Sequence, residues 1–539
     1  MQDYPSIFND AIGPVMRGPS SSHCAAALRI GRLARDLMGG NLSHVLVEFD
    51  PAGSLATTHT SQGSDMGLCG GLLGWEATDE RLAFSVQAIA EAGIAVVFRV
   101  TGIGATHPNT YRLTLASADE THVLTALSTG GGMVEVIEID GAPVSIRGDT
   151  PVTLLFGRGD PAALAEALAQ VLALPMGADA PGIEPDAIRA HAGAGTGFVE
   201  VRAQRFLTDE VRTWAGAAFE VTHVRTLSPV LPVLTPRALR VPFITCEEMA
   251  AYNADRGLPL WELACDYECA RGGLTREQVL SRMLETVGIM RSAVRQGLAG
   301  TDYADRILGP QSGGFQRALE DGRLLDGGML NRMILYVTAL MEAKSAMGVF
   351  VAAPTAGACG GLPGACLGAV DALGLGETEA AQAMLAAGLV GVFIAARATF
   401  AAEVAGCQAE CGAGSAMAAA ALVTLAGGAA AQAVSAASMA LQAILGLICD
   451  PVANRVEVPC LGRNVMAASN ALACANMALA GYDAVVPLDE VIETMLRVGE
   501  SLPSSLRCTA LGGLSITRAS RAIEARLDRQ GRAEGDPLR

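Results

Sequence analysis

Three cysteines in the C-terminal half of the chain each stand in a short polar motif. Cys407 lies in GCQAE, Cys449 in CDP and Cys460 in VPCLGRN, at successive spacings of 42 and 11 residues. Thiolate is the soft ligand that selects zinc or an iron–sulfur cluster. Three thiolates can hold a 4Fe–4S cluster and leave one iron open as a Lewis acid for a substrate hydroxyl. The alternative is three free cysteines that serve as small apolar core residues.

The residues beside these cysteines favour a site over plain helical core. Glu410 and Asp450 lie one to three residues from a cysteine. An apolar core does not ordinarily need charged and amide groups next to each thiol. We therefore expect the polar neighbours Gln408, Arg463 and Asn464 to contact a bound substrate.

A serine-rich motif, GPSSSH, precedes the first predicted helix. Hydroxyls and free amides at the start of a helix can bind a carboxylate, so Ser20, Ser21 and Ser22 are candidate substrate ligands. His23 is a candidate proton carrier, because histidine titrates near neutral pH and the chain has only 7 of them. The plainer interpretation is an N-cap cluster that satisfies backbone amides.

Two other loops carry groups of the same kind. THPNTYR places His107 and Asn109 at the entrance of a predicted strand, where the histidine is a second acid–base candidate. A turn with a solvated histidine would give the same sequence. The glycine-rich APTAGACGGLPG (353–364) predicts a loop whose backbone approaches a substrate, with Thr355 and Gly357 as candidate contacts.

The composition indicates which partners the protein can bind and in which compartment it is expected. The net charge of −17 argues against a nucleic-acid or anionic-membrane partner, although a local cationic pocket can still bind a small anionic substrate. The 13 cysteines, without a secretory signal, favour a reducing cytosol. Two apolar stretches, 380–396 and 416–432, are short for a membrane span and rich in Ala and Gly. We expect buried helices of a soluble bundle there.

Hydrophobic periodicity divides the chain into three predicted parts. Residues 1–135 alternate strand and helix signals, and residues 136–238 indicate a βαβ-type module that ends in a proline-rich linker. Residues 239–539 are nearly all helical in pattern, with glycine-rich interruptions. The strands and the helix expected in the first part are 45–50, 95–100, 111–117 and 24–37. The predicted fold class is multidomain: an α/β domain, an α+β module and a large all-α domain.

Taken in order, these motifs resemble those of the iron–sulfur L-serine dehydratases, also called L-serine ammonia-lyases. The resemblance covers nearly the whole chain. Residues 1–235 are similar to the beta subunit of the two-subunit type and 240–520 to the alpha subunit, here fused in one chain. The matching stretches are IGPVMRGPSSSH, GSLA followed by GSD, HPNTYR, TGGG, APTAGACGGLPG, GCQAE with GSAMAAAA, CDPV with VEVPCLGRN, and LPSSLRCTALGGL.

The resemblance implies a fold and a cofactor. The N-terminal domain would be like the allosteric-substrate-binding domain of phosphoglycerate dehydrogenases, followed by an ACT-like module and an all-helical catalytic domain. The family's cluster cysteines correspond to Cys407, Cys449 and Cys460. The cofactor would be a 4Fe–4S cluster with one open iron, without pyridoxal phosphate. The resemblance also implies a cytoplasmic homodimer that acts on a small molecule, with no nucleic-acid or membrane partner.

Three residues depart from the family's pattern. Gln62 stands in SQGSD where the family commonly has the histidine of GHGTD, which leaves the identity of the base open. Arg17 and Lys344 replace an apolar residue and an asparagine near the expected substrate loops. The two cations either bind a second carboxylate of the substrate or face solvent on their flexible stems.

The function that we predict is α,β-elimination of water from a small β-hydroxy acid, most simply from L-serine to pyruvate and ammonia. The open iron would polarise the hydroxyl while His23 or His107 removes the Cα proton. A second hypothesis, favoured by Arg17 and Lys344, is a dicarboxylic substrate such as 2-(hydroxymethyl)glutarate or hydroxyaspartate. A third is an amino-acid sensor with a structural cluster. Three-thiolate ligation argues against the sensor, because structural sites are normally fully ligated by protein.

Overall fold

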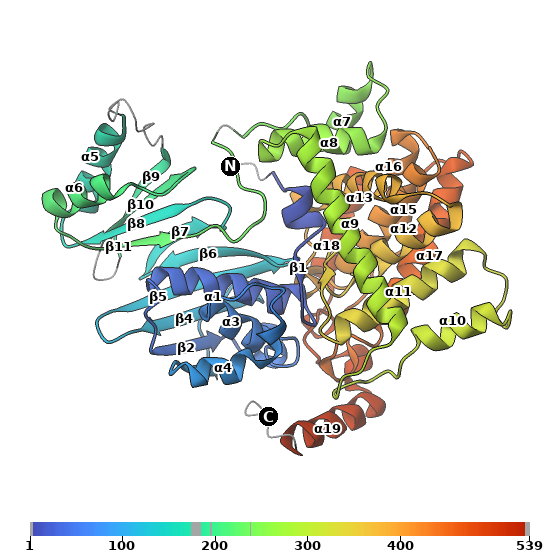
Figure 1. Ribbon diagram of the computed structural model, residues 1–539, viewed down its shortest axis with the longest axis horizontal. Coiled ribbons are helices and arrows are strands. Elements are labelled where there is room, and N and C mark those ends of the chain that lie inside the picture. Colours follow the sequence, from blue (N-terminus) through green and yellow to red (C-terminus); the bar gives the residue numbers. More distant parts are fainter. Residues whose placement is uncertain (1–3, 174–184, 194–196, 238, 534–539) are drawn as a thin grey trace.

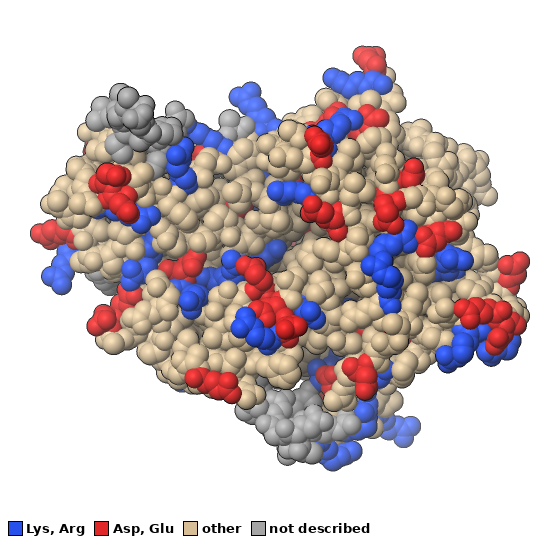
Figure 2. Space-filling view, in the orientation of Figure 1, with Lys and Arg blue, Asp and Glu red and all other residues tan. Residues whose placement is uncertain are grey.

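The computed structural model describes residues 4–173, 185–193, 197–237 and 239–533. Two β-sheet parts lie side by side on one side of the molecule, and a helical part forms the other side (Figure 1). On the face drawn in Figure 2, acidic and basic side chains are interspersed over all three parts. The multidomain fold class with mixed sheets and many helices is therefore confirmed.

The first part is built on a six-stranded sheet with the order β3-β2-β4-β5-β6-β7. β2 and β3 pair in parallel, and the other neighbours are antiparallel. Helices α1 and α3 can pack closely because Gly71 of α3 has no side chain. A Cβ at Gly71 would lie 2.1 Å from the Leu28 carbonyl oxygen of α1. The elements are η2 (Ser21–Ala25), α1 (Ala26–Leu37), β2 (His44–Phe49), α2 (Leu55–Thr58), α3 (Ser64–Leu72), η3 (Glu80–Phe84), α4 (Ser85–Glu91), β3 (Ala95–Val100), β4 (Thr110–Ala116), β5 (Thr121–Gly130), β6 (Met133–Ile139) and β7 (Ala142–Ile146).

The first sheet extends beyond residue 135, where we expected the second part to begin. VEVIEI belongs to β6, which pairs antiparallel with β5. β7 continues the same sheet by pairing with β6. The alternating pattern of VEVIEI predicts a strand but does not predict which sheet it joins, because the two sheets follow each other directly in the sequence. The structural boundary lies after Ile146.

The second part is a β-α-β-β-α-β unit with an antiparallel sheet of order β11-β8-β10-β9. This connectivity is that of the ferredoxin-like split βαβ motif. Leu154, Phe156 and Leu227 share a buried core with the first part. The structure thus has strands and helices where a βαβ-type module was expected, and the ACT-like character of this unit stays a prediction. The elements are β8 (Val152–Gly157), α5 (Pro161–Ala173), β9 (Pro185–His191), β10 (Gly197–Ala203), α6 (Asp209–Phe219) and β11 (Val221–Leu227).

As far as the structure describes it, the third part is helical apart from the two-residue strand β12, so the all-α domain expected there is plausible. Its longest apolar helix, α13, passes a membrane-span test of length and composition, but 78% of its apolar window is buried inside the protein. The 416–432 stretch is divided between two helices. The elements are α7 (Cys246–Asn253), α8 (Leu260–Gly272), α9 (Arg276–Ala299), α10 (Ser312–Glu320), α11 (Met329–Ser345), β12 (Phe350–Val351), α12 (Gly361–Leu373), α13 (Glu377–Arg397), α14 (Ala402–Ala405), η4 (Gln408–Gly412), α15 (Ala413–Leu425), α16 (Ala430–Gln442), η5 (Val452–Asn454), α17 (Cys460–Leu479), α18 (Leu488–Ser501), η6 (Ser504–Leu506), η7 (Gly513–Ile516) and α19 (Arg518–Ala533).

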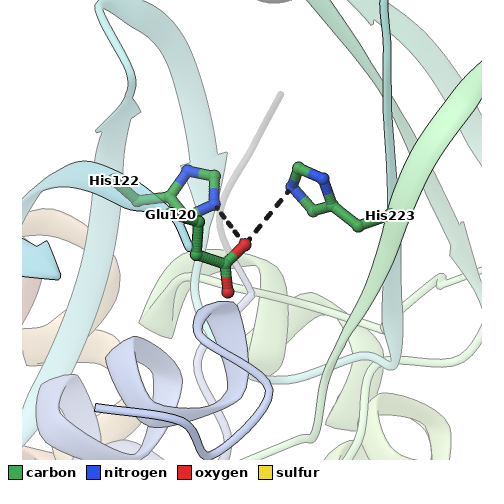
Figure 3. Close-up of side chains that lie close together, drawn as sticks. All are labelled: Glu120, His122 and His223. Atoms are coloured by element: carbon green, nitrogen blue, oxygen red, sulfur yellow. Dashed lines mark ion pairs between the residues drawn. The ribbon is translucent and has the colours of Figure 1, made fainter. Parts of the chain in front are cut away.

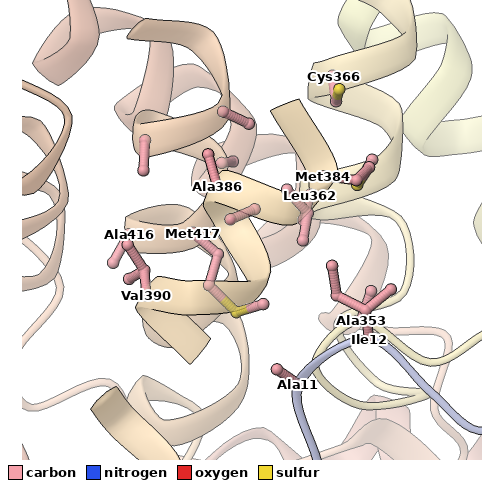
Figure 4. Packing of buried hydrophobic residues seen from close by; sticks show 14 of the residues in the cluster. Ala11, Ile12, Ala353, Leu362, Cys366, Met384, Ala386, Val390, Ala416 and Met417 are labelled. Atoms are coloured by element: carbon pink, nitrogen blue, oxygen red, sulfur yellow. The ribbon is translucent and has the colours of Figure 1, made fainter. Parts of the chain in front are cut away.

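Small residues let these helices approach one another closely. A Cβ added at Gly297 of α9 would lie 2.0 Å from the Ala339 carbonyl oxygen of α11. Figure 4 shows Ala386, Val390 and Met417 packed among neighbouring helices of this core. The high Ala and Gly content and the low aromatic content therefore reflect close helix packing rather than a loosely filled interior.

The N-terminal segment belongs structurally to the helical part. η1 (Ile7–Ala11) packs on α13, and the Ile7 amide donates to Glu268 Oε2 at 2.8 Å. β1 (Val15–Met16) pairs antiparallel with β12. The N-terminal segment therefore packs against the third part, and the chain then continues into the first part. This route fixes GPSSSH at the junction of the two parts.

Candidate active site

Hydrogen bonds at this junction join the GPSSSH motif to the glycine-rich loop after β12. Ser21 Oγ accepts from the Ala356 amide at 3.1 Å. The Ser22 carbonyl accepts from Ser128 Oγ, at the end of β5, at 2.7 Å. Both serines are buried. Three segments that are distant in the sequence thus meet at one buried place.

The His23 ring is fully buried at the centre of this junction. Its Nε2 lies 2.7 Å from Thr58 Oγ1, and its Nδ1 lies 3.0 Å from Ser20 Oγ. Because the Thr58 hydroxyl donates to the Ser54 carbonyl at 2.7 Å, it accepts from His23, and the ring proton is assigned to Nε2. Nδ1 then accepts from the Ser20 hydroxyl and lies 3.5 Å from Glu403 Oε1. Burial lowers the pKa of His23 to about 3, so the ring is neutral at physiological pH.

Glu403 is a buried carboxyl group that faces His23. Burial and the neighbouring Glu410 raise the pKa of Glu403 to about 7. Asn109 lies close enough to offset part of this rise, although both polar atoms of its side chain are buried without a hydrogen-bond partner among the described residues. Glu403 Oε2 is unpartnered in the same sense. Unsatisfied buried groups cost free energy, so they mark a place where a polar ligand would be stabilised.

The predicted cysteines converge on the same region. Ligand atoms of Cys407, Glu410 and Cys449 all lie within 4.8 Å of one another. Hydrogen bonds with Cys407 and Cys508, together with burial, hold the pKa of the Cys449 thiol well above its usual range. Cys460 begins α17, and its pKa is raised by burial and by the charge of Cys407. Cys508 therefore adds a fourth thiol to the three that we expected.

A cation and a second carboxyl group flank the thiols. Arg463 Nη1 lies 3.4 Å from Cys407 Sγ, and Arg463 Nη2 donates to Asp450 Oδ1 at 2.5 Å. Thr355 Oγ1 donates to Glu410 Oε1 at 2.6 Å. Burial raises the pKa of Glu410. Arg463 thus supplies fixed positive charge where a sulfur ligand would carry negative charge.

Two predicted substrate ligands hold the backbone in place. Asn464 Oδ1 accepts from the amides of Gly360 and Gly361 at 3.1 and 2.7 Å, and its Nδ2 donates to the Gly357 carbonyl at 2.7 Å. Gln408 makes three hydrogen bonds of 2.9–3.0 Å, all with backbone groups. The side-chain amide groups of both residues are thus hydrogen-bonded to the backbone. They position the glycine-rich loop and the cysteine segment.

The two candidate acid–base histidines differ in their surroundings. His107 is half-buried before β4, and its Nδ1 accepts from the Asn109 amide of the same turn at 3.2 Å. Burial lowers the pKa of His107. His23 has an acidic partner at 3.5 Å, whereas the His107 ring accepts a hydrogen bond from its own loop. The structure therefore favours His23 as the histidine of the site.

The two additional cations have backbone partners. Arg17 donates from Nε to the Thr78 carbonyl at 2.8 Å and from Nη1 to the Met347 carbonyl at 2.6 Å. Lys344 is buried and donates from Nζ to the Val456 carbonyl. The charge of Lys344 lowers the pKa of Cys460, against the larger effect of burial. Lys344 thus belongs to the thiol region, and Arg17 binds two backbone segments together.

Sequence reasoning missed Glu403 and Cys508 as site residues. Glu403 is an isolated acid in the apolar stretch FAAEVAGC, four residues before Cys407, and that isolation is the signal that could have revealed it. Cys508 hydrogen-bonds through its amide to the Cys449 carbonyl at 3.0 Å. Gln62 Nε2 lies 3.4 Å from the Cys508 sulfur. The residue that departs from the family's pattern therefore contacts the unexpected thiol.

The geometry of the site defines a class of protein. A neutral histidine, a carboxyl group that titrates near neutrality and an unsatisfied amide lie in one buried region with a group of thiols. Perturbed titratable groups that converge in this way are typical of enzyme active sites.

The profile of the family described as "Serine dehydratase alpha chain" matches residues 255–515. The probable L-serine dehydratase alpha chain of Bacillus subtilis is 38% identical over 253 residues, which cover 47% of this chain and 84% of the relative. The alpha chain of Peptoniphilus asaccharolyticus is 34% identical over 290 residues, 53% of this chain and 99% of the relative. The probable beta chain of Bacillus subtilis is 41% identical over 152 residues, 28% of this chain and 68% of that protein.

The chain belongs to the L-serine dehydratase family. It is similar both to alpha chains and to a beta chain of relatives, which agrees with the fusion inferred from the motifs. All 13 cysteines are free thiols in the structure.

Proposed function

We propose that this chain is an iron–sulfur-dependent lyase that converts L-serine to pyruvate and ammonia. The observation that carries the proposal is the neutral His23 paired with Glu403 beside converging cysteines. The relatives that match the chain are named L-serine dehydratases, which supports serine as the substrate.

We assign Cys407, Cys449 and Cys460 as the ligands of a 4Fe–4S cluster with one open iron. The donor set fits the group, because the buried Cys407 and Cys449 lie together and the charge of Cys407 acts on the buried Cys460 thiol. The raised pKa values of Cys449 and Cys460 would keep both thiols protonated without a metal, and metal binding is what stabilises a buried thiolate. When bound, the cluster would supply a Lewis-acidic iron for the substrate hydroxyl.

The protein's own groups would move the two protons of the elimination. His23 Nδ1, which holds a lone pair, takes the Cα proton of serine. Glu403, protonated below about pH 7, donates its proton to the departing hydroxyl, which leaves as water. The enamine product tautomerises and takes up one water to give pyruvate and ammonia. Asn109, with both amide atoms unsatisfied, binds a polar group of the substrate.

The alternative hypotheses have less support. A dicarboxylic substrate needs a free cation for its second carboxylate, and Arg17 is already bonded to two carbonyls. Lys344 is bonded to the Val456 carbonyl, and its charge acts on the Cys460 thiol. The sensor hypothesis gives no role to an acid–base pair, and the matched relatives are named dehydratases.

An anaerobic substrate screen tests the proposal. The purified holoprotein is offered L-serine, hydroxyaspartate or 2-(hydroxymethyl)glutarate, while ammonia and unsaturated acid are measured separately. We expect equal amounts of pyruvate and ammonia from L-serine. An unsaturated dicarboxylate without ammonia from 2-(hydroxymethyl)glutarate, or oxaloacetate with ammonia from hydroxyaspartate, with no turnover of serine, would replace serine by the dicarboxylic substrate. No turnover of any of the three by iron-loaded protein would overturn the assignment as a dehydratase.

A further inference from the structure

A second group of metal-binding side chains lies far from the cysteines in sequence, between the first part and the module. Glu120 and His122 stand at the start of β5, and His223 stands on β11. The ligand atoms of the three residues lie within 4.8 Å of one another. Figure 3 shows both rings turned toward Glu120 from two different sheets. The proposed activity uses none of these residues.

Hydrogen bonds assign the proton of each histidine ring to the nitrogen that points away from Glu120. His122 Nδ1 lies 2.7 Å from Asp140 Oδ2, and a carboxylate only accepts, so Nδ1 donates. His223 Nδ1 lies 3.1 Å from Thr222 Oγ1. The Thr222 hydroxyl can donate to the Phe156 carbonyl at 3.2 Å, so it accepts from His223. In the neutral rings both Nε2 atoms are therefore lone-pair nitrogens.

These lone pairs meet a carboxylate oxygen with no hydrogen-bond donor between them. His122 Nε2 lies 3.5 Å and His223 Nε2 lies 3.8 Å from Glu120 Oε2. Both Nε2 atoms are buried without a hydrogen-bond partner among the residues that the structure describes. A proton on one ring would relieve one of the two contacts. A metal ion would satisfy all three ligand atoms together.

The distances suit a tetrahedral ion. Zinc bonds to nitrogen and oxygen of about 2.0–2.1 Å, at tetrahedral angles, place neighbouring ligand atoms about 3.3–3.4 Å apart. The observed 3.5 and 3.8 Å need only small side-chain movements. Asp140 is the carboxylate partner that metal-binding histidines usually have behind them. Arg225 Nη2 contacts both Glu120 oxygens, at 2.6 and 2.7 Å, so it holds the carboxylate but also competes for its charge.

We propose that Glu120, His122 and His223 bind a divalent transition metal of the zinc class, with a fourth position left for water. Two histidines and one glutamate are a ligand set that zinc accepts with an open position. The ion would link the turn before β5 to strand β11. It would therefore fasten the module to the first part and stabilise the folded protein against heating.

The test is equilibrium dialysis of the holoprotein against Zn²⁺, with metal and iron counted per chain by mass spectrometry. Wild type should bind one zinc ion that His122→Ala and His223→Ala both lose, with iron unchanged. Exposed His44 provides the matched control, and His44→Ala should bind like wild type. Asp140→Asn should weaken zinc binding about 10–100-fold. Zinc should raise the thermal midpoint of wild type but not that of His223→Ala.

Cobalt distinguishes this site from the thiols. Co²⁺ bound by nitrogen and oxygen gives visible d–d bands without the near-ultraviolet sulfur-to-cobalt bands of a thiolate site. Zinc stoichiometry that is equal in wild type and both histidine variants would overturn the proposal, as would a cobalt spectrum dominated by sulfur. If the alanine variants do not fold, Glu120→Gln, which keeps the side chain's shape, decides the question: retained binding there refutes the site.

Discussion

Replacement of Glu403 by glutamine tests the acid–base pair most sharply. The glutamine side chain would fill nearly the same space as the carboxyl group but could not donate a proton to the leaving hydroxyl. A correctly placed proton donor contributes about 10²–10⁴-fold in rate. We therefore expect Glu403→Gln to lower kcat by about that factor while the iron content stays that of wild type.

The pH dependence follows from the same residue. Burial and Glu410 raise the pKa of Glu403 to about 7, so the acid form falls to about one tenth at pH 8 and loses about tenfold for each further pH unit. Because the protonated form is the active one, kcat/KM of wild type should fall above pH 7. His23, with a pKa of about 3, stays neutral across that range and adds no limb of its own.

The assay is anaerobic pyruvate formation from L-serine between pH 6 and 9, with iron measured in each sample. Buried Glu268, which bonds to Ser6 Oγ and the Ile7 amide, offers a matched control. Glu268→Gln should keep both the activity and the limb near pH 7, whereas Glu403→Gln should lose the limb. A wild-type profile that is flat from pH 7 to 8.5, or a glutamine variant that retains the limb, would refute the role of Glu403.

Three further outcomes are expected. Gly297→Ala places a Cβ 2.0 Å from the Ala339 carbonyl oxygen and should destabilise the protein by about 1–3 kcal/mol. A Cβ at Gly288 of the same helix meets nothing within 4 Å, so Gly288→Ala should be neutral or mildly stabilising. Thermal unfolding of the two variants measures the difference. His23 is buried in its neutral form, with its pKa lowered from 6.5 to about 3. The folding stability that depends on this residue is therefore full above pH 6.5 and is lost, at up to about 1.4 kcal/mol per pH unit, as the pH falls below 6.5. His23→Asn should flatten this dependence of the unfolding free energy on pH, and an unchanged slope would contradict the burial argument. Activity should decay in air and return with ferrous iron and thiol, because an open iron is labile; full activity after aerobic incubation without metal would count against the cluster.

The elements of the fold were largely visible in the sequence, but their assembly was not. The strands at 45–50, 95–100 and 111–117 appear as His44–Phe49, Ala95–Val100 and Thr110–Ala116, because alternating apolar residues are a local signal. The pairing of β6 with β5 instead of the module, and of β1 with β12, depends on contacts that no local pattern specifies. The boundary expected at residue 135 was therefore placed too early.

The candidate site was predictable where a motif carried it. The cysteine motifs and His23 pointed to residues that the structure brings together, because their residue types are rare in such surroundings. Gln408 and Asn464 have polar side chains whose hydrogen bonds with the backbone appear only in three dimensions. Glu403 lies outside any motif, and its importance comes from burial against His23. His122 and His223 are about a hundred residues apart, so only the folded chain shows that they are neighbours.

The central claim is that converging cysteines hold an iron–sulfur cluster on which serine dehydration depends. Helix α17 contains both Cys460, assigned as a ligand, and Cys474, which contacts Asn470 instead. The decisive measurement is iron per chain together with L-serine turnover in anaerobic preparations of Cys460→Ser and Cys474→Ser. We expect Cys460→Ser to lose cluster iron and turnover together, while Cys474→Ser keeps both. Wild-type iron and turnover in Cys460→Ser would contradict the account.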